Sequence, residues 1–160
     1  MERGRLLPFS SRSRKPSRLA LAFSVARAFV ASRWPAARFV RLKVGCPEIE
    51  HLRRSGQGAI SERALMHVGH LQGTVCASPA AGNHDDRYLF GLLLHEFGHL
   101  GSGGGEMDAD RWVLEEFGVR ILYDGPLDLE RVDGDVVSRV VRVAIRAGVD
   151  LKHNPPAPQR

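Results

Sequence analysis

Cysteine and long apolar runs are scarce in this sequence of 160 residues. Its two cysteines, Cys46 and Cys76, are too few and too far apart for a disulfide framework or a CxxC metal knuckle, so we expect both thiols to be reduced. No apolar run reaches the roughly 18 uncharged residues that a membrane-spanning helix requires, because Arg27 interrupts the run at residues 19–31. The sequence therefore predicts a soluble protein without a membrane span.

Acidic residues are almost absent from the first 43 positions, where Glu2 is the one acid. The basic residues of the same stretch are Arg3, Arg5, Arg12, Arg14, Lys15, Arg18, Arg27, Arg33, Arg38, Arg41 and Lys43. Such asymmetry occurs in arms that bind nucleic acids or membrane surfaces. No nucleic-acid-binding motif accompanies the charge, so we interpret the stretch as a solvated leader and expect no nucleic-acid partner.

The chain length suits one domain, because domains commonly have roughly 100–200 residues. Residues 1–17 combine Ser, Arg and Pro without periodicity, which predicts a disordered basic leader. Residues 18–150 are expected to form the domain, and residues 151–160 a flexible tail. Basic residues ahead of the apolar run resemble a signal or transit peptide, but Arg27 and the lack of a cleavage site before Pro35 argue against one. We therefore expect a cytoplasmic protein.

Apolar periodicity and capping residues predict an α+β fold that is mainly helical with a small sheet. The expected helices span about 18–33, capped by Ser17, then 60–71, 86–100, 106–117, and a last one from near Asp135 to Gly148. The expected strands span about 37–44, 74–77 and 119–123. The helix at 86–100 is apolar on nearly every side, which predicts that it is buried among other elements.

The stretch LLHEFGHLG carries the chemistry of the sequence. His95 and His99 are one helical turn apart, so both imidazoles leave the same helix face and can bind one ion. Neutral imidazole nitrogen is a good ligand for zinc. Glu96 lies beside the metal but off the ligand axis, where it can take a proton from a zinc-bound water. The pattern therefore predicts a Zn²⁺ site with Glu96 as general base.

This stretch resembles the active-site helix of the zincin metallopeptidases, and the following EMDAD resembles the ligand helix of gluzincins. The short outline is similar to minigluzincins and to the ImmA/IrrE-like peptidases of bacteria and phages. The resemblance covers little more than residues 88–117. It implies a third ligand from the second helix and an edge strand that holds an extended peptide, for which residues 74–77 are the candidate. Ser102 and Gly105 stand where a metzincin needs Gly and His, which excludes that subclass.

The third ligand is expected from the helix at 106–117. Glu106 and Asp110 share one face of it, and a glycine-rich loop from residue 101 lets the helix return antiparallel beside the first. Glu106 would then lie level with His99, and Asp110 level with His95. We predict Glu106 as the ligand and Asp110 as the acceptor that orients a ligating histidine, with Asp110 as the alternative ligand.

Other residues near the motif have roles that the sequence leaves open. His67 and His70 could meet on a helix, but they have no acidic residue close by and are more often surface residues. Four residues could stabilise the oxyanion of a peptidase, and nothing in the sequence chooses among them: Tyr88, Arg111, Tyr123 and His84.

The sequence thus predicts a zinc-dependent metallopeptidase that hydrolyses peptide bonds through a zinc-bound water activated by Glu96, with a peptide or protein as substrate. The alternative is a catalytically weak regulatory or binding protein that keeps a zincin-like fold and contacts a partner or nucleic acid through its basic N-terminal part. The substrate protein and the oligomeric state stay open.

Overall fold

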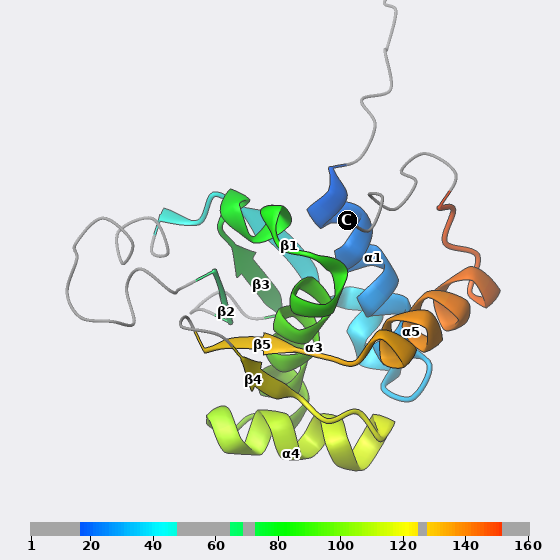
Figure 1. Cartoon of the computed structure of the whole chain (residues 1–160). Coiled ribbons are helices and arrows are strands. Elements are labelled where there is room, and N and C mark those ends of the chain that lie inside the picture. The colour runs from blue at the N-terminus through cyan, green and yellow to red at the C-terminus, as the bar shows by residue number, and fades with distance from the viewer. Residues whose placement is uncertain (1–16, 48–64, 69–72, 125–127, 152–160) are drawn as a thin grey trace, which may run out of the picture.

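The structure is a computed structural model that describes residues 17–47, 65–68, 73–124 and 128–151. These residues form a small α+β domain that is mainly helical (Figure 1). The α-helices are α1 (Arg18–Ala31), α3 (Asp86–Ser102), α4 (Glu106–Phe117) and α5 (Gly134–Arg146), and the 3-10 helices are η1 (Pro35–Phe39) and η2 (Pro79–Asn83). The strands are β1 (Arg41–Val44), β2 (Met66–Val68), β3 (Thr74–Ala77), β4 (Leu122–Asp124) and β5 (Leu129–Arg131). The predicted fold class is confirmed at this level.

Helix α3 lies at the centre of the fold, and its ends follow ordinary capping rules. The Asp85 side chain accepts a hydrogen bond from the Tyr88 backbone N–H at 3.1 Å, and Asp86 places a second acid in the first turn. Gly103, at φ 67°, ends the helix in the left-handed conformation that favours glycine. Every residue from Leu89 to Gly98 is buried, as the apolar pattern predicted.

Helices α1 and α5 pack on one side of α3 (Figure 1). The rings of Phe23 in α1 and Phe97 in α3 stack with their centroids 5.7 Å apart. Helix α5 contacts α1 and buries Val140 and Ala144, the apolar stripe expected from the sequence. None of the helices in the described ranges has the length and hydropathy needed to cross a membrane.

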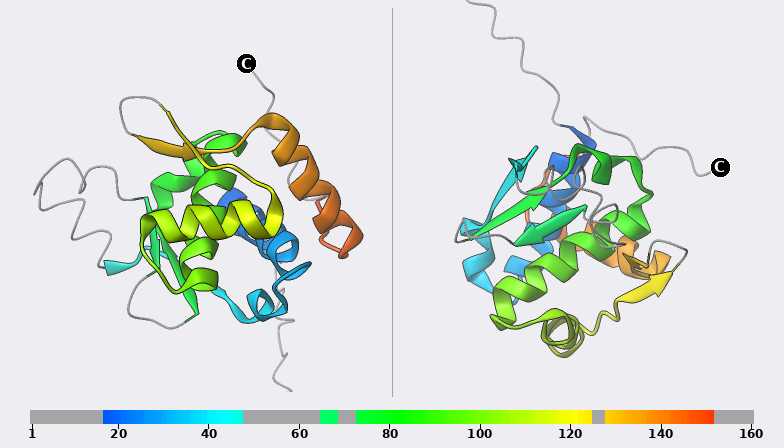
Figure 2. Two further views of the ribbon diagram at one scale, coloured as in Figure 1. Left: turned by 90° about the horizontal axis from the view of Figure 1, so that it is seen from below. Right: turned by 90° about the vertical axis from the view of Figure 1, so that its left-hand side faces the viewer.

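The three-stranded sheet has the order β1-β3-β2, with β1 parallel and β2 antiparallel to β3. The expectation that residues 74–77 form the edge strand is wrong, because β3 has a partner on each side and is buried along its whole length. Val75 and Ala77 belong to the main core, and Thr74 and Cys76 alternate with them onto the other face. The outer strand that contacts α3 is β2 (Figure 2).

Two further predicted elements differ from the structure. Residues 66–68 were expected in a helix but pair with β3 as a strand, because periodicity cannot distinguish helix from strand in so short an apolar run. The rest of that predicted helix, residues 60–64 and 69–71, lies outside the described residues. The strand expected over 37–44 is shorter, because Pro35 starts a 3-10 helix and pairing begins only at Arg41.

The hairpin of β4 and β5 packs against α3. The approach is close, because a Cβ added to Gly91 of α3 would lie 2.5 Å from the carbonyl oxygen of Glu130 in β5. The strand expected at 119–123 is found in part, because β4 covers Leu122–Asp124, and β5 was not predicted. This hairpin brings Tyr123 and Glu130, which are paired across it, toward the HExxH segment of α3.

Candidate metal centre

The side chains of His95, His99 and Glu106 converge on one point. The two histidine Nε2 atoms lie 3.1 Å apart. One Glu106 oxygen lies 2.7 Å from Nε2 of His95, and the other lies 3.4 Å from Nε2 of His99. His95 is buried, His99 is partly buried and Glu106 is exposed, so the group opens toward solvent on the side of α4. These three residues could hold a metal ion, and they are the three that the sequence predicted as ligands.

The other ring nitrogen of each histidine is already occupied by an acceptor. Nδ1–H of His95 donates to Asp110 Oδ1 at 2.7 Å, and Nδ1–H of His99 donates to the Gly104 carbonyl at 3.0 Å. In a neutral imidazole one nitrogen carries the proton and the other a lone pair. With Nδ1 engaged in this way, both histidines turn Nε2 toward the point where they meet.

This arrangement needs positive charge at its centre. Two Nε2 atoms and a carboxylate face one another at 2.7–3.4 Å, and positive charge among them, from a proton on His95 or from a metal ion, stabilises this arrangement. A proton on His95 Nε2 can satisfy only one of these contacts at a time. A divalent ion with several coordination positions satisfies all of them, and nitrogen and carboxylate oxygen are the donors that zinc prefers. The residues present thus fit a zinc ion.

Asp110 occupies the place expected for a residue that orients a ligand. Its Oδ1 accepts from His95, and its Oδ2 accepts from the hydroxyl of Tyr123 at 2.7 Å. The series Tyr123–Asp110–His95 therefore links the β4–β5 hairpin to helix α3 through hydrogen bonds between side chains. Burial and the Asp110 carboxylate raise the pKa of Tyr123, so its hydroxyl stays protonated and remains a donor.

Helix α4 brings both acids to His95 by crossing α3 steeply (Figure 2). The sequence predicted an antiparallel return, with Glu106 level with His99 and Asp110 level with His95. The antiparallel direction is wrong, because the chain turns at Gly103 into a crossing; Asp110 does contact His95 as expected, and Glu106 contacts His95 as well as His99. The crossing is possible because Gly98 of α3 has no side chain: a Cβ there would lie 2.5 Å from the Ala109 carbonyl oxygen.

Glu96 is buried beside this group and is incompletely hydrogen-bonded. Its side chain is 5% exposed, and its Oε2 has no hydrogen-bond partner among the described residues. The backbone of Val68 in β2 hydrogen-bonds the carboxyl group. Burial raises the pKa of Glu96 to about 8, against the opposing charge of His95. Glu96 is thus a buried acid with one oxygen available for a proton, at the junction of α3 and β2.

Burial and charged neighbours act on the pKa of His95 in opposite directions, and the charged neighbours prevail. Burial by itself lowers its pKa, but the hydrogen bond to Asp110 and the charges of Glu96 and Glu130 outweigh burial and raise the pKa to about 9. The site therefore has a surplus of negative charge, which favours a cation next to His95.

Glu130 is a residue of this site that sequence reasoning missed. It lies in β5, and its charge acts on His95, Glu96 and Tyr123. Burial raises its own pKa. The signal that could have found it was weak, because β5 has three residues and its alternation of Leu129, Glu130 and Arg131 was not recognised as a strand.

Of the four residues considered for oxyanion stabilisation, Tyr123 is the one that the structure joins to the site by a hydrogen bond. Arg111 Nη1 lies 3.6 Å from Asp108 Oδ1, so its guanidinium pairs with an acid on its own helix, α4. The Tyr88 and His84 rings contact each other, with centroids 6.2 Å apart.

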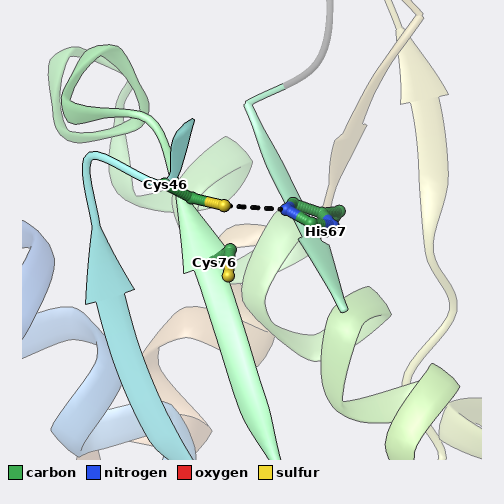
Figure 3. Close-up of side chains that lie close together, drawn as sticks. All are labelled: Cys46, His67 and Cys76. Carbon is green, nitrogen blue, oxygen red and sulfur yellow. Dashed lines mark hydrogen bonds between the residues drawn. The ribbon is translucent and has the colours of Figure 1, made fainter. Parts of the chain in front are cut away.

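A second group of ligand-type side chains lies on the three-stranded sheet, formed by Cys46, His67 and Cys76 (Figure 3). The two cysteines carry no disulfide bond, as expected. Their meeting was not predictable from the sequence, because 29 residues separate them and the order of the strands brings the two segments together. His67 was weighed as a helical partner of His70. Instead it lies on β2, and His70 lies outside the described residues.

The comparisons with known proteins gave no match, whether to a protein-family model, to a curated protein or to a solved structure.

Proposed function

We propose that this protein is a zinc-dependent peptidase of the zincin type, in which His95, His99 and Glu106 hold the ion and Glu96 is the general base. The observation that carries the proposal is the convergence of two Nε2 atoms and a carboxylate within 3.4 Å, next to a buried glutamate with one unpartnered oxygen. A metal site of purely structural type has no need for such a glutamate, since its ligands close the coordination shell.

The residues of the chain have distinct parts in this chemistry. A bound zinc ion would polarise a water molecule and the carbonyl of the scissile peptide bond. Glu96 accepts the proton of the attacking water on its available oxygen and then gives it to the leaving amine. The added positive charge beside Glu96 favours its ionised form, which is the form that a base requires. Asp110 holds His95 in the tautomer that keeps Nε2 unprotonated.

Strand β2 supports the binding of an extended peptide. It is an outer strand of the sheet formed by the described residues, it runs antiparallel to β3, and it contacts α3. A peptide that pairs with such a strand is held by main-chain hydrogen bonds rather than by one side chain. The hydrogen bond between Val68 and Glu96 fixes this strand relative to the general base.

The test has two parts, metal content and turnover. We expect about one zinc ion at this site, lost on changing His95 and His99 together to Ala. Glu96→Gln should keep the ion and lower the hydrolysis of a quenched fluorogenic peptide library by about 100-fold or more, because the amide keeps the shape of the side chain and cannot accept the proton. Glu115→Gln, an exposed acid on α4, is the matched control and should change neither.

Two results would count against the proposal. Loss of the ion in Glu96→Gln would make Glu96 a structural residue. Zinc binding without hydrolysis of any library peptide, together with a partner interaction that survives Glu96→Gln, would instead favour the regulatory protein with a zincin-like fold.

A further inference from the structure

We propose that Cys46, His67 and Cys76 form a second metal site, separate from the first, which binds zinc through two thiolates and one imidazole. Nothing in this inference depends on peptidase activity, and it rests on a different set of residues. The three ligand atoms lie within 4.8 Å of one another, and they come from three segments of the chain.

The sheet places these side chains together. Cys76 and His67 are direct partners in the antiparallel pair of β3 and β2, so both project from the same face of the sheet. Cys46 follows the end of β1, on the other side of β3, after Gly45 at φ 76° turns the chain. The backbone N–H of Gly45 bonds the Ala77 carbonyl at 3.0 Å, which holds this turn against β3. Figure 3 shows Cys46 and His67 pointing toward one another with Cys76 beside them.

The spacing of the ligand atoms suits zinc. With Zn–S near 2.3 Å and Zn–N near 2.0–2.1 Å, a tetrahedral ion places a sulfur and a nitrogen ligand about 3.5 Å apart and two sulfurs about 3.8 Å apart. Sγ of Cys46 lies 3.4 Å from Nε2 of His67, close to the first of these values. The remaining separations need only small side-chain rotations, because none exceeds 4.8 Å.

The donor set also selects the ion. Cys46 is 3% and Cys76 1% exposed, and their face of the sheet is not the face that joins the main core. Burial disfavours an isolated thiolate, whereas a zinc ion deprotonates a coordinating thiol outright. Two thiolates with one imidazole are typical of zinc, and half-buried His67 leaves a route for the ion to enter.

Such an ion would fasten the outer strand to the sheet. Strand β2 has three residues, so only a short ladder of hydrogen bonds joins it to β3. His67 precedes Val68, whose backbone bonds Glu96. A zinc ion on His67 would therefore tie β2 to β3 and to the end of β1.

Cobalt substitution tests the site in the unmodified chain. Cobalt bound to thiolate gives an intense charge-transfer absorption in the near ultraviolet, which cobalt bound to histidine and carboxylate does not give. The chain has two cysteines, so any such absorption must arise from Cys46 or Cys76. After reduction and removal of metal, we expect cobalt to produce this band and zinc to abolish it.

Variants separate the two sites. The change of His95 and His99 together to Ala should keep the thiolate band. The test of the cysteine site therefore does not depend on whether the proposed peptidase site binds metal. Cys76→Ser should weaken cobalt affinity at the thiolate site by about 100-fold or more, since even a residue that only orients a ligand costs about 10–100-fold. Because Cys76 is buried, its substitution could also disturb folding, so the half-buried His67 is changed as an independent test. His67→Cys should keep the ion and intensify the band, whereas His67→Ala should weaken cobalt binding. His84→Ala, a change outside both groups of ligands, should alter neither the thiolate band nor the affinity for cobalt.

The proposal is overturned if the reduced unmodified chain binds cobalt without a thiolate band. It is also overturned if a disulfide joins Cys46 and Cys76 in the purified protein and the reduced thiols bind no metal, since the pair would then be a redox pair. A band of equal intensity in the unmodified chain and in His67→Ala would remove His67 from the site.

Discussion

Gly98 of α3 and Ala109 of α4 are in backbone contact: a Cβ added to Gly98 would lie 2.5 Å from the Ala109 carbonyl oxygen and 2.8 Å from its carbonyl carbon. Ala109 stands between the two site acids in sequence, and Gly98 immediately precedes His99. The distance between these two backbones therefore sets how far the α4 acids must reach to the histidines. Glycine at this position in the HExxH motif is a requirement of the helix crossing.

We predict that Gly98→Ala disrupts the site. The neighbouring atoms are backbone, so α4 must move away, and overpacking of this kind costs about 1–3 kcal/mol of unfolding free energy. Because the movement draws Glu106 and Asp110 from His95, zinc affinity should fall as well. Denaturant unfolding and competition for zinc with a chromophoric chelator measure the two effects.

Gly134→Ala is the matched control for this change. Gly134 begins α5, and a Cβ there meets no atom within 4 Å. Stability should stay the same or rise slightly, because alanine has the better helix propensity. If Gly98→Ala is as harmless as Gly134→Ala, the contact between α3 and α4 is looser than the structure has it.

The second prediction ranks the two acids of α4. Glu106→Gln should weaken zinc binding more than Asp110→Asn does, because Glu106 faces both Nε2 atoms whereas Asp110 accepts from Nδ1 of His95. The loss for Asp110→Asn should fall within about 10–100-fold. Isothermal titration of each variant, with Glu115→Gln as the exposed control, gives the order. If Asp110→Asn strips the ion and Glu106→Gln does not, the roles of the two acids are reversed.

The HExxH helix and its partners were predictable because their signals are local. Asp85 caps α3, Gly103 ends it, and the spacing of His95 and His99 is contained within one helical turn. The place of Glu106 followed from the short glycine loop. These features depend on residues a few positions apart, which the sequence displays directly.

The rest depends on contacts between distant segments. The position of β3 in the middle of the sheet, the hydrogen bond from Tyr123 to Asp110 and the meeting of Cys46 with Cys76 all arise from strand pairing. Three-residue strands such as β2 and β5 leave too short a pattern to be recognised. The crossing angle of α3 and α4 was missed because a glycine loop permits several directions, and the contact of Gly98 with Ala109 selects one.

The third prediction concerns the start of the domain. A chain that begins at Ser17 should fold and bind zinc like the full chain, because Ser17 supplies the cap of α1 by accepting from the Ala20 N–H at 3.1 Å. Arg18 should not be removable, since its guanidinium bonds the carbonyls of Gly82 and His84 and pairs with Asp86 at the start of α3.

Thermal unfolding and metal analysis of chains that begin at Ser17 and at Leu19 test this boundary. The longer of the two should match the full chain, and the shorter should be less stable by about 1–3 kcal/mol, because it loses both the cap and hydrogen bonds to a charged group. Equal loss in both would mean that residues 1–16 contribute to the stability of the domain.

The last prediction concerns Tyr123, whose hydroxyl donates to Asp110 Oδ2 at 2.7 Å. Tyr123→Phe removes this hydrogen bond and nothing else, so Asp110 should hold His95 less firmly. We expect zinc affinity to fall by about 10-fold or less, the low end of the range for residues that orient a ligand, with hydrolysis at saturating zinc nearly unchanged. Tyr88→Phe is the control, because its ring contacts His84 outside the site. Chelator competition gives the affinity, and kcat and KM for a peptide at saturating zinc give the turnover. Unchanged affinity with a kcat that falls about 100-fold would contradict the positioning role, and Tyr123 would then act on the oxyanion of the peptide itself.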